Sequence, residues 1–213
     1  MTTSEHTQTA ASDDPLTRNL QEVGFPTLGH FLEEGFVDPR VRALVPDVKI
    51  VGRAVTVRIV PPDATPMAEA LDLLGPGDVL VVDTGQNATH APIGAVTGCA
   101  AQAAGAAGIV VDGVVTDLRE LREMRLPVFA RGTSLLTTKR LGRRDGGVGR
   151  TVSCGGAVVR PGDLVLADDN GVLVVSPQIA ADVLARALAS DRAEPALLAR
   201  LRAGESPLNV LSD

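Results

Sequence analysis

Aromatic residues are almost absent from this sequence of 213 residues, which contains four Phe, no Trp and no Tyr. Its core therefore has to be built from Ala, Val, Leu and Ile. Proteins that bind single-stranded nucleic acid stack the bases on aromatic side chains, so this class is disfavoured. The net charge of −6 also disfavours polyanion binding, because phosphate backbones attract basic surfaces. We therefore expect no nucleic-acid partner.

Cysteine is equally scarce, and long apolar runs are missing. Cys99 and Cys154 are too few for a disulfide framework and form no CxxC motif. No run of 18 apolar residues occurs, so we expect no membrane-spanning segment. Glu5 stands where a signal peptide carries positive charge, and no apolar segment follows it. These absences predict a cytoplasmic protein that does not bind membranes.

The order of elements along the chain predicts one α/β domain. Residues 1–14 are small and polar, which predicts a disordered tail, and we expect residues 15–213 to form a single domain. From residue 49 to 132, β-branched runs alternate with helical stretches, a pattern typical of βαβ units and a parallel sheet. The predicted strands are 49–60, 79–82, 109–113 and 126–132, and the predicted helices are 67–74, 94–107 and 116–124.

The last third of the chain has a different pattern. Residues 151–176 consist of short β-branched runs between turns, and the DNG turn at 169–171 predicts a hairpin in a small antiparallel unit. Residues 178–203 predict a helix that Pro195 can interrupt. Cys99 lies in the Ala-rich helix 94–107, where we expect it to be a small core residue.

Ligand-binding residues are expected where the parallel strands end. Ligands of open α/β sheets bind outside the carboxyl ends of the strands, which here are followed by residues 83–94 and 114–117. The first loop leads into the helix that begins near Gly94, and the free N–H groups of a helix start suit a carboxylate or a phosphate. The segment from Gly94 to Thr97 is therefore either an anion pocket or an ordinary loop.

Two side chains in these loops admit more than one role. The carboxylate of Asp117 could hold a hard cation such as Mg²⁺, or Asp117 or Thr116 could cap the following helix. His90 could act as an acid, a base or a ligand, although a single histidine most often does none of these. The sequence contains no GxGxxG, HExxH or GxSxG motif, so the common nucleotide-binding and hydrolase chemistries are not indicated.

Five segments together resemble a known family. They are GRAVTV at 52–57, GDVLVVD at 77–83, AAGAAGIVVDGVVTD at 103–117, LPVFARGTS at 126–134 and VVRPGDLVLADDNGVLVVS at 158–176. Their order and spacing are similar to those of the RraA-like family. This family includes the class II 4-hydroxy-4-methyl-2-oxoglutarate / 4-carboxy-4-hydroxy-2-oxoadipate aldolases and the ribonuclease E inhibitor RraA. The resemblance covers residues 20–205.

The resemblance implies a fold, an assembly and a chemistry. The fold would be a compact αββα sandwich of the swivelling β/β/α type, with a β-rich C-terminal subregion and a C-terminal helix. The assembly would be a homotrimer, or a hexamer of two trimers, with active sites between subunits. In the aldolases of this family a divalent metal, Mg²⁺ or Mn²⁺, binds the pyruvyl part of the substrate and acts as a Lewis acid during C–C cleavage.

Several positions of this chain match functional positions of the family. By this resemblance Asp117 is the metal ligand, and Gly94, Val96 and Thr97 are the positions whose backbone holds the substrate carboxylate. Glu194 matches, by its spacing in the C-terminal helix, a glutamate that a neighbouring subunit contributes to order a metal-bound water. The resemblance thus assigns a catalytic role to Glu194.

Two positions depart from the family pattern. Thr116 replaces an arginine that clamps a carboxylate, and Ala95 replaces an acidic or amide residue that takes part in proton transfer. His90 is a candidate replacement for the missing proton relay, and Arg119 or Arg122 for the missing positive charge.

Two functions are therefore expected from the sequence. The first is a divergent metal-dependent lyase that releases pyruvate from a small 2-oxo acid. It would act by retro-aldol cleavage of a 4-hydroxy-2-oxo acid or by decarboxylation of oxaloacetate. The alternative is a non-catalytic oligomer that binds and regulates a protein partner.

Overall fold

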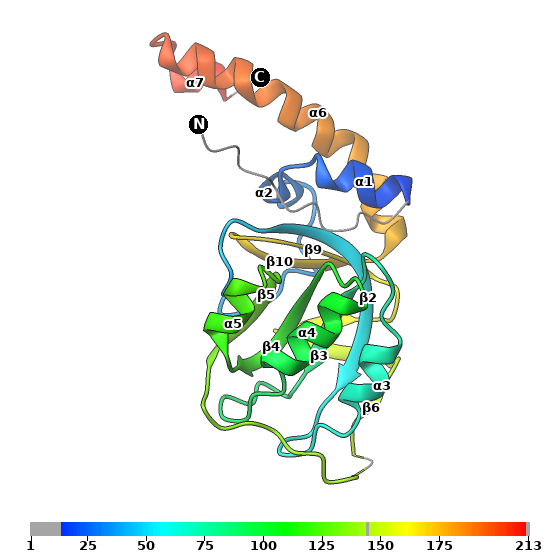
Figure 1. Ribbon diagram of the computed structural model, residues 1–213. Helices are drawn as coiled ribbons and strands as arrows, with labels where there is room; N and C mark the ends of the chain where they lie inside the picture. The colour runs from blue at the N-terminus through cyan, green and yellow to red at the C-terminus, as the bar shows by residue number, and fades with distance from the viewer. Residues whose placement is uncertain (1–13, 144, 212–213) are drawn as a thin grey trace.

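The central feature of the computed structural model is an eight-stranded sheet within the described residues, 14–143 and 145–211 (Figure 1). The strand order is β1-β5-β4-β3-β2-β9-β10, and β6 pairs with β2 beside this path. β2, β3, β4 and β5 are parallel neighbours, which confirms the predicted parallel sheet. The strands are β1 (Arg42–Ala43), β2 (Lys49–Arg58), β3 (Val79–Asp83), β4 (Gly108–Val115), β5 (Val128–Thr133), β6 (Gly147–Val148), β9 (Leu164–Asp168) and β10 (Gly171–Val175).

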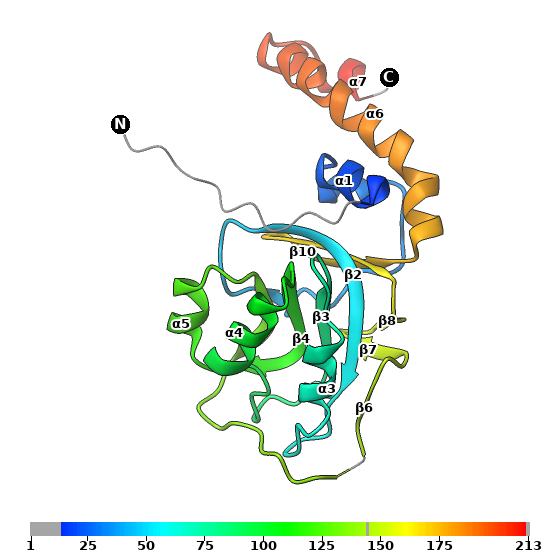
Figure 2. The ribbon, with the colours of Figure 1, turned by 45° about the vertical axis from the view of Figure 1, so that its right-hand side comes forward.

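The helices between the parallel strands cover one face of the sheet (Figure 2). They are α3 (Met67–Asp72), α4 (Ala95–Ala103) and α5 (Leu118–Glu123). Successive side chains of a strand point to opposite faces, so Leu80, Ile109 and Val128 pack into the core on this side. Most side chains of this core are small and aliphatic, as the scarcity of aromatic residues requires.

The hairpin of β7 (Val152–Cys154) and β8 (Ala157–Val159) packs on the opposite face, against Val110 and Phe129. The Cys154 thiol is buried there, and this burial raises its pKa. Cys99 is exposed on α4, so the expectation of a core cysteine at that position is wrong. The reason is that α4 carries small apolar residues on all sides, and its sequence does not show which side faces the sheet.

β2 joins two halves of the sheet. Residues 49–53 pair with β9, and residues 54–58 pair with β3. The predicted DNG turn is confirmed, because it connects β9 to β10. The predicted small antiparallel unit is divided, however: β9 and β10 extend the main sheet through β2, whereas β7 and β8 form a sheet of their own.

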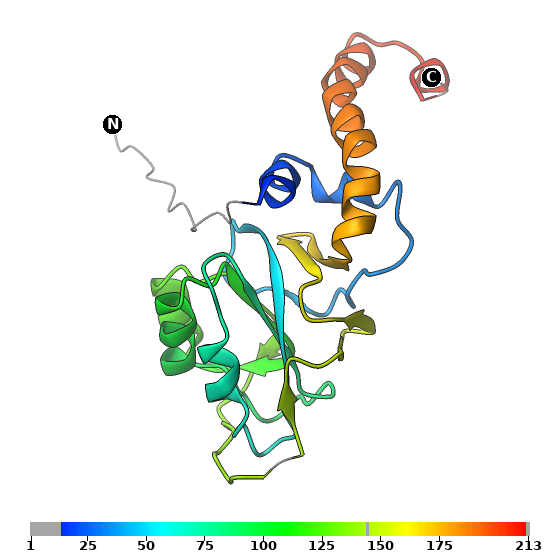
Figure 3. The same ribbon diagram turned by 90° about the vertical axis from the view of Figure 1, so that its right-hand side faces the viewer.

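Helices also cover the half of the sheet that contains β9 and β10 (Figure 3). They are α1 (Pro15–Gln21), α2 (Phe25–Leu28) and the first half of α6 (Pro177–Arg202). Leu20, Leu166 and Val183 represent the core between these helices and the strands. Together with α3, α4 and α5 on the other side, these layers confirm the αββα arrangement and the C-terminal helix.

α6 extends beyond the body of the molecule towards α7 (Pro207–Val210) (Figure 1). Pro195 lies inside α6 without interrupting it, although an interior proline removes an intrahelical hydrogen bond and crowds the preceding turn. The Ala and Leu residues that follow it are strong helix formers and favour the continued helix. The Asp191 carboxylate accepts hydrogen bonds from the Gly24 N–H, at 2.7 Å, and from the Thr27 hydroxyl. These bonds tie α6 to the start of α2.

The predicted tail, residues 1–14, falls almost entirely outside the described residues, which begin at Asp14. Asp14 itself caps α1: its carboxylate accepts a hydrogen bond of 3.0 Å from the Leu16 N–H and pairs with Arg53 at 2.7 Å. In the part of the chain that the structure describes, every helix is too short or too polar to cross a membrane.

Candidate active site

The carboxyl ends of β3 and β4 lie side by side, as predicted, with Asp83 opposite Asp112. The loop after β3 is held by its own side chains. The Asn87 Oδ1 atom accepts hydrogen bonds from the N–H groups of Thr89 and His90, at 3.1 and 2.7 Å. A second contact, from the Thr84 hydroxyl to the Asp112 carbonyl at 2.6 Å, ties the loop to β4. These contacts hold the loop that leads to α4.

Gly94 is the N-cap residue of α4, and this glycine is closely packed. A Cβ atom at this position would lie 2.5 Å from Asp117 Oδ2 and 2.7 Å from Thr116 Cγ2. The Gly94 N–H donates a hydrogen bond of 2.8 Å to the Thr97 hydroxyl. The N–H groups of Val96 and Thr97 belong to the first turn, where a helix supplies no acceptor. This helix start is therefore suited to an anion.

The side chain of Asp117 lies at this helix start. Asp117 occupies the N-cap position of α5, but its backbone is left-handed, with a φ of 51°, and its side chain makes no capping bond to α5. Instead, Oδ2 accepts a hydrogen bond of 2.8 Å from the Ala95 N–H, and Oδ1 accepts one of 3.2 Å from the Thr116 hydroxyl. The side-chain cap expected at α5 from Asp117 or Thr116 is therefore not formed, and the Asp117 carboxylate instead caps the first turn of α4.

The predicted metal ligand and the predicted anion pocket thus coincide. Asp117 is exposed, so its carboxylate is open to a further ligand. Within residues 14–143 and 145–211, no three His, Cys, Asp or Glu side chains form a group that could hold a metal ion. A cation at Asp117 would have one protein carboxylate. This arrangement fits Mg²⁺, which keeps several waters and takes further oxygen ligands from its substrate.

The two predicted catalytic residues, His90 and Glu194, form no hydrogen bond with Asp117 in the described part of the chain. The His90 ring has its Nδ1 atom 2.9 Å from the Thr89 hydroxyl, and no hydrogen bond among the described residues joins it to Asp117. Glu194 is exposed and belongs to α6, whose outer half extends away from α4 and α5 of the same chain (Figure 1). Any contact of Glu194 with this site therefore has to come from a second subunit, as the family resemblance implies.

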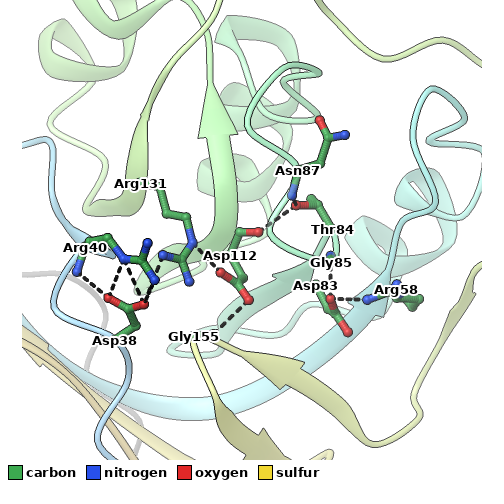
Figure 4. Close-up of polar contacts among 10 residues, drawn as sticks. All are labelled: Asp38, Arg40, Arg58, Asp83, Thr84, Gly85, Asn87, Asp112, Arg131 and Gly155. Carbon is green, nitrogen blue, oxygen red and sulfur yellow. Dashed lines mark hydrogen bonds and ion pairs between the residues drawn. The ribbon is translucent and has the colours of Figure 1, made fainter.

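A buried polar cluster lies on the other face of the sheet (Figure 4). The Asp112 carboxylate accepts hydrogen bonds from Arg131 Nε, at 2.6 Å, and from the Gly155 N–H, at 2.8 Å. In the same way, Asp83 accepts bonds from Arg58 and from the Ser153 N–H. These two aspartates therefore anchor the β7–β8 hairpin to the sheet.

Asp38 extends this cluster towards the surface. Its carboxylate accepts hydrogen bonds from Arg40 Nε, at 3.0 Å, and from Arg131 Nη1, at 3.2 Å. The Arg40 guanidinium and then Arg131 hold the pKa of Asp38 well below its usual range. The sequence carries a signal for this cluster, which was missed above: Asp83, Asp112 and Arg131 are charged residues within or ending strongly apolar strands.

Comparison with known proteins identifies similar sequences. A family model described as RraA-like, Aldolase/RraA, matches residues 12–174. A protein of Halalkalibacterium halodurans with the provisional name 4-hydroxy-4-methyl-2-oxoglutarate aldolase is 35% identical over 147 residues, which cover 69% of each chain.

Solved structures are similar as well. RraAS2 of Streptomyces coelicolor, described as an unusual member of the RNase ES inhibitor RraA protein family, has a TM-score of 0.77 and 28% identity. The match covers 89% of this chain and 98% of that one. The RNA-processing inhibitor RraA from Thermus thermophilis has a TM-score of 0.66 and 28% identity, covering 73% of this chain and 93% of that one.

Proposed function

This chain belongs to the RraA-like family, and we propose that it is a metal-dependent lyase that releases pyruvate from a small 2-oxo acid. The observation that carries this proposal is the hydrogen bond between Asp117 and the Ala95 N–H. It brings a candidate cation ligand and the free amides of a helix start to one exposed place. A 2-oxo acid presents a carboxylate beside a carbonyl oxygen, so it can engage an amide and a cation together.

In the proposed reaction, the Asp117 carboxylate and the amides of the helix start have separate roles. A divalent ion at Asp117, Mg²⁺ or Mn²⁺, would supply a Lewis acid for the negative charge that develops on the 2-oxo group during C–C cleavage. The N–H groups of Val96 and Thr97 would bind the substrate carboxylate and fix its orientation. Gly94 allows this close approach, because any side chain there would displace Asp117.

Proton transfer needs further groups, because the side chain of Ala95 can neither accept nor donate a proton. His90 lies in the loop that leads to α4, and we propose that it accepts or donates the proton directly or through water. Glu194 would order a water from across a subunit interface, which requires the homotrimer or hexamer that the resemblance implies. The Thr116 hydroxyl donates a hydrogen bond to Asp117 and so orients the carboxylate.

The departures at Thr116 and Ala95 favour a second function. Without an arginine at position 116, a second substrate carboxylate loses a bidentate partner. This observation, together with the similarity to RraAS2 and RraA, supports an oligomer that binds a protein partner and has no catalytic activity. In that case the Asp117–Ala95 contact would serve only to cap α4.

The test is pyruvate release from a panel of 4-hydroxy-2-oxo acids and oxaloacetate, with Mg²⁺ or Mn²⁺ and again with a chelator. Asp117→Asn removes the charge while keeping a side chain that tolerates a left-handed backbone. Asp72→Asn is the matched control, because Asp72 is exposed on α3. The lyase predicts metal-dependent release that Asp117→Asn abolishes and Asp72→Asn preserves. No release from the assembled oligomer with any substrate would exclude it and favour the partner-binding function.

A further inference from the structure

A cavity that Asp117 does not line lies at the outer edge of the buried polar cluster. It has a volume of about 300 Å³ and is lined by Arg40, Arg42, Gln86, Ala88 and Arg131. These residues come from the segment before and in β1, the loop after β3, and β5. We call this cavity the arginine pocket. Three separate chain segments line the arginine pocket, so it is not a patch on a single helix.

The arginine pocket opens on the face of the sheet that does not carry α4. In β5, Ala130 packs into the core beneath α3, α4 and α5, so Arg131, the next residue, points the other way. In β4, Val111 and Asp112 alternate in the same manner. Arg131 therefore lines the pocket on the face of the sheet opposite α4, the helix whose start the Asp117 carboxylate contacts.

The charge around the pocket is positive, although the chain as a whole is acidic. Three guanidinium groups line it, whereas two carboxylates, Asp38 and Asp112, face these groups. Among residues 14–143 and 145–211, the Arg42 side chain has no hydrogen-bond or ion-pair partner. The Arg40 side chain is 74% exposed and is held by Asp38 alone. One positive charge is therefore uncompensated here.

Arg131 supplies an independent observation. Its side chain is only 10% exposed, and Nε and Nη1 donate to Asp112 and Asp38. Its Nη2 atom is buried and lacks an acceptor within the described part of the chain. A buried donor without an acceptor is unfavourable, and such groups in native proteins usually have a partner that completes the site.

We propose that the arginine pocket binds the carboxylate or phosphate group of a small metabolite. Both groups present paired oxygens that match the fork of a guanidinium, which explains why arginine rather than lysine lines the cavity. The anion would be held by Arg42 and Arg40, and a small shift of Arg131 towards the cavity would give Nη2 its acceptor. A volume of about 300 Å³ is at the lower end for ligand cavities, so the metabolite has to be small.

The proposal is tested by titrating the full chain with succinate, with inorganic phosphate, and with chloride as the reference anion, at constant ionic strength. A chelator is present throughout, so that no divalent ion engages Asp117. Binding is measured by calorimetry, and the ¹⁵N signals of the Arg131 guanidinium are followed by NMR. We expect saturable binding of succinate or phosphate, but not of chloride, together with a shift of the Arg131 signals.

Two variants locate the binding site without disturbing the buried cluster. Arg42→Gln removes an exposed charge that has no partner, and Arg192→Gln removes an exposed arginine of α6. Losing a charged hydrogen-bond partner should weaken binding roughly tenfold or more in Arg42→Gln and leave it unchanged in Arg192→Gln. Asp117→Asn should also bind normally, because Asp117 does not line the arginine pocket.

The outcomes separate the sources of the anion. Binding of succinate identifies a carboxylic acid as the ligand class, and binding of phosphate identifies a phosphate ester or free phosphate; either supports the pocket. The proposal is overturned if neither anion binds saturably, or if Arg42→Gln and Arg192→Gln bind equally well. It is also overturned if a crystal grown with saturating anion shows only water at Arg131 Nη2.

Discussion

The carboxylate of Asp117 and the backbone N–H of Ala95 are joined by a hydrogen bond of 2.8 Å, although 22 residues separate them in the chain. The contact depends on the left-handed backbone of Asp117, which turns its side chain away from α5 and towards α4. It also depends on Gly94, which leaves room for the carboxylate. The contact at the proposed active site therefore requires a particular backbone conformation at Asp117 and the absence of a side chain at Gly94.

Gly94→Ala should displace Asp117. The new Cβ atom would approach Asp117 Oδ2 to 2.5 Å, so the carboxylate has to move from the helix start. Overpacking of this kind costs about 1–3 kcal/mol of stability. We expect metal-dependent pyruvate release to fall by much more than the stability does, as measured by steady-state kinetics and thermal unfolding. Gly147→Ala is the control, since its Cβ would meet no atom closer than 3.4 Å. Equal activity of the two variants would contradict the proposed site.

Thr116→Arg should restore a carboxylate clamp beside Asp117. An arginine there can form charged hydrogen bonds to a second substrate carboxylate, and such bonds are worth about 1.5–3 kcal/mol. We expect kcat/KM for dicarboxylic 2-oxo substrates to rise roughly tenfold or more, with little change for substrates that have one carboxylate. Thr116→Gln provides a long side chain without charge. The prediction is wrong if Thr116→Gln raises kcat/KM as much as Thr116→Arg.

Asp112→Ala should strongly destabilise the protein. The change leaves Arg131 Nε and the Gly155 N–H without their acceptor in a buried place, where the Asp112 side chain is 2% exposed. Breaking a buried ion pair on one side costs about 3–5 kcal/mol. Glu123→Ala is the matched control, because it removes an exposed ion pair to Arg119 worth about 0.3–0.5 kcal/mol. Urea unfolding of the two variants measures both values, and similar losses would refute the anchoring role of Asp112.

Asp63 should make stability depend on pH in the acid range. Burial alone would raise its pKa, but hydrogen bonds from Thr65 and from the N–H groups of Leu141 and Arg143 lower the pKa to about 2. A carboxyl group with a lowered pKa stabilises the fold above its unfolded pKa, about 3.9, and loses this effect as pH falls towards the folded pKa.

Asp63→Asn should therefore lower the free energy of unfolding most at neutral pH. The difference from the natural protein should shrink as pH falls from about 4 to about 2, because protonation removes the charge of Asp63 in both states. Urea unfolding at a series of pH values measures this difference. A difference that stays constant over that range would show that the charge of Asp63 does not stabilise the loop 139–143.

Much of the fold was predictable because its signals are local. The apolar runs at 79–82 and 109–113 correspond to β3 and β4, and the DNG turn connects β9 to β10. The continuity of α6 through Pro195 and the exposure of Cys99 were not predictable in this way. The exposure of Cys99 depends on which side of α4 meets the rest of the protein, and a helix made mostly of small apolar residues does not encode that side. The continuity of α6 depends on whether the helix on both sides of Pro195 is stable enough to tolerate the lost hydrogen bond.

The candidate site shows the same division. The sequence by itself determined that a helix starts at Gly94 after one strand and that Asp117 follows the next strand. Apolar runs mark where strands end, and small residues mark where this helix starts, so local patterns suffice for both placements. Only the tertiary structure decided that Asp117 caps α4 instead of α5, and that Arg40, Arg42 and Arg131 share one cavity. Such contacts join segments far apart in the chain, so they follow from strand order, register and the direction of each side chain, which no local pattern specifies.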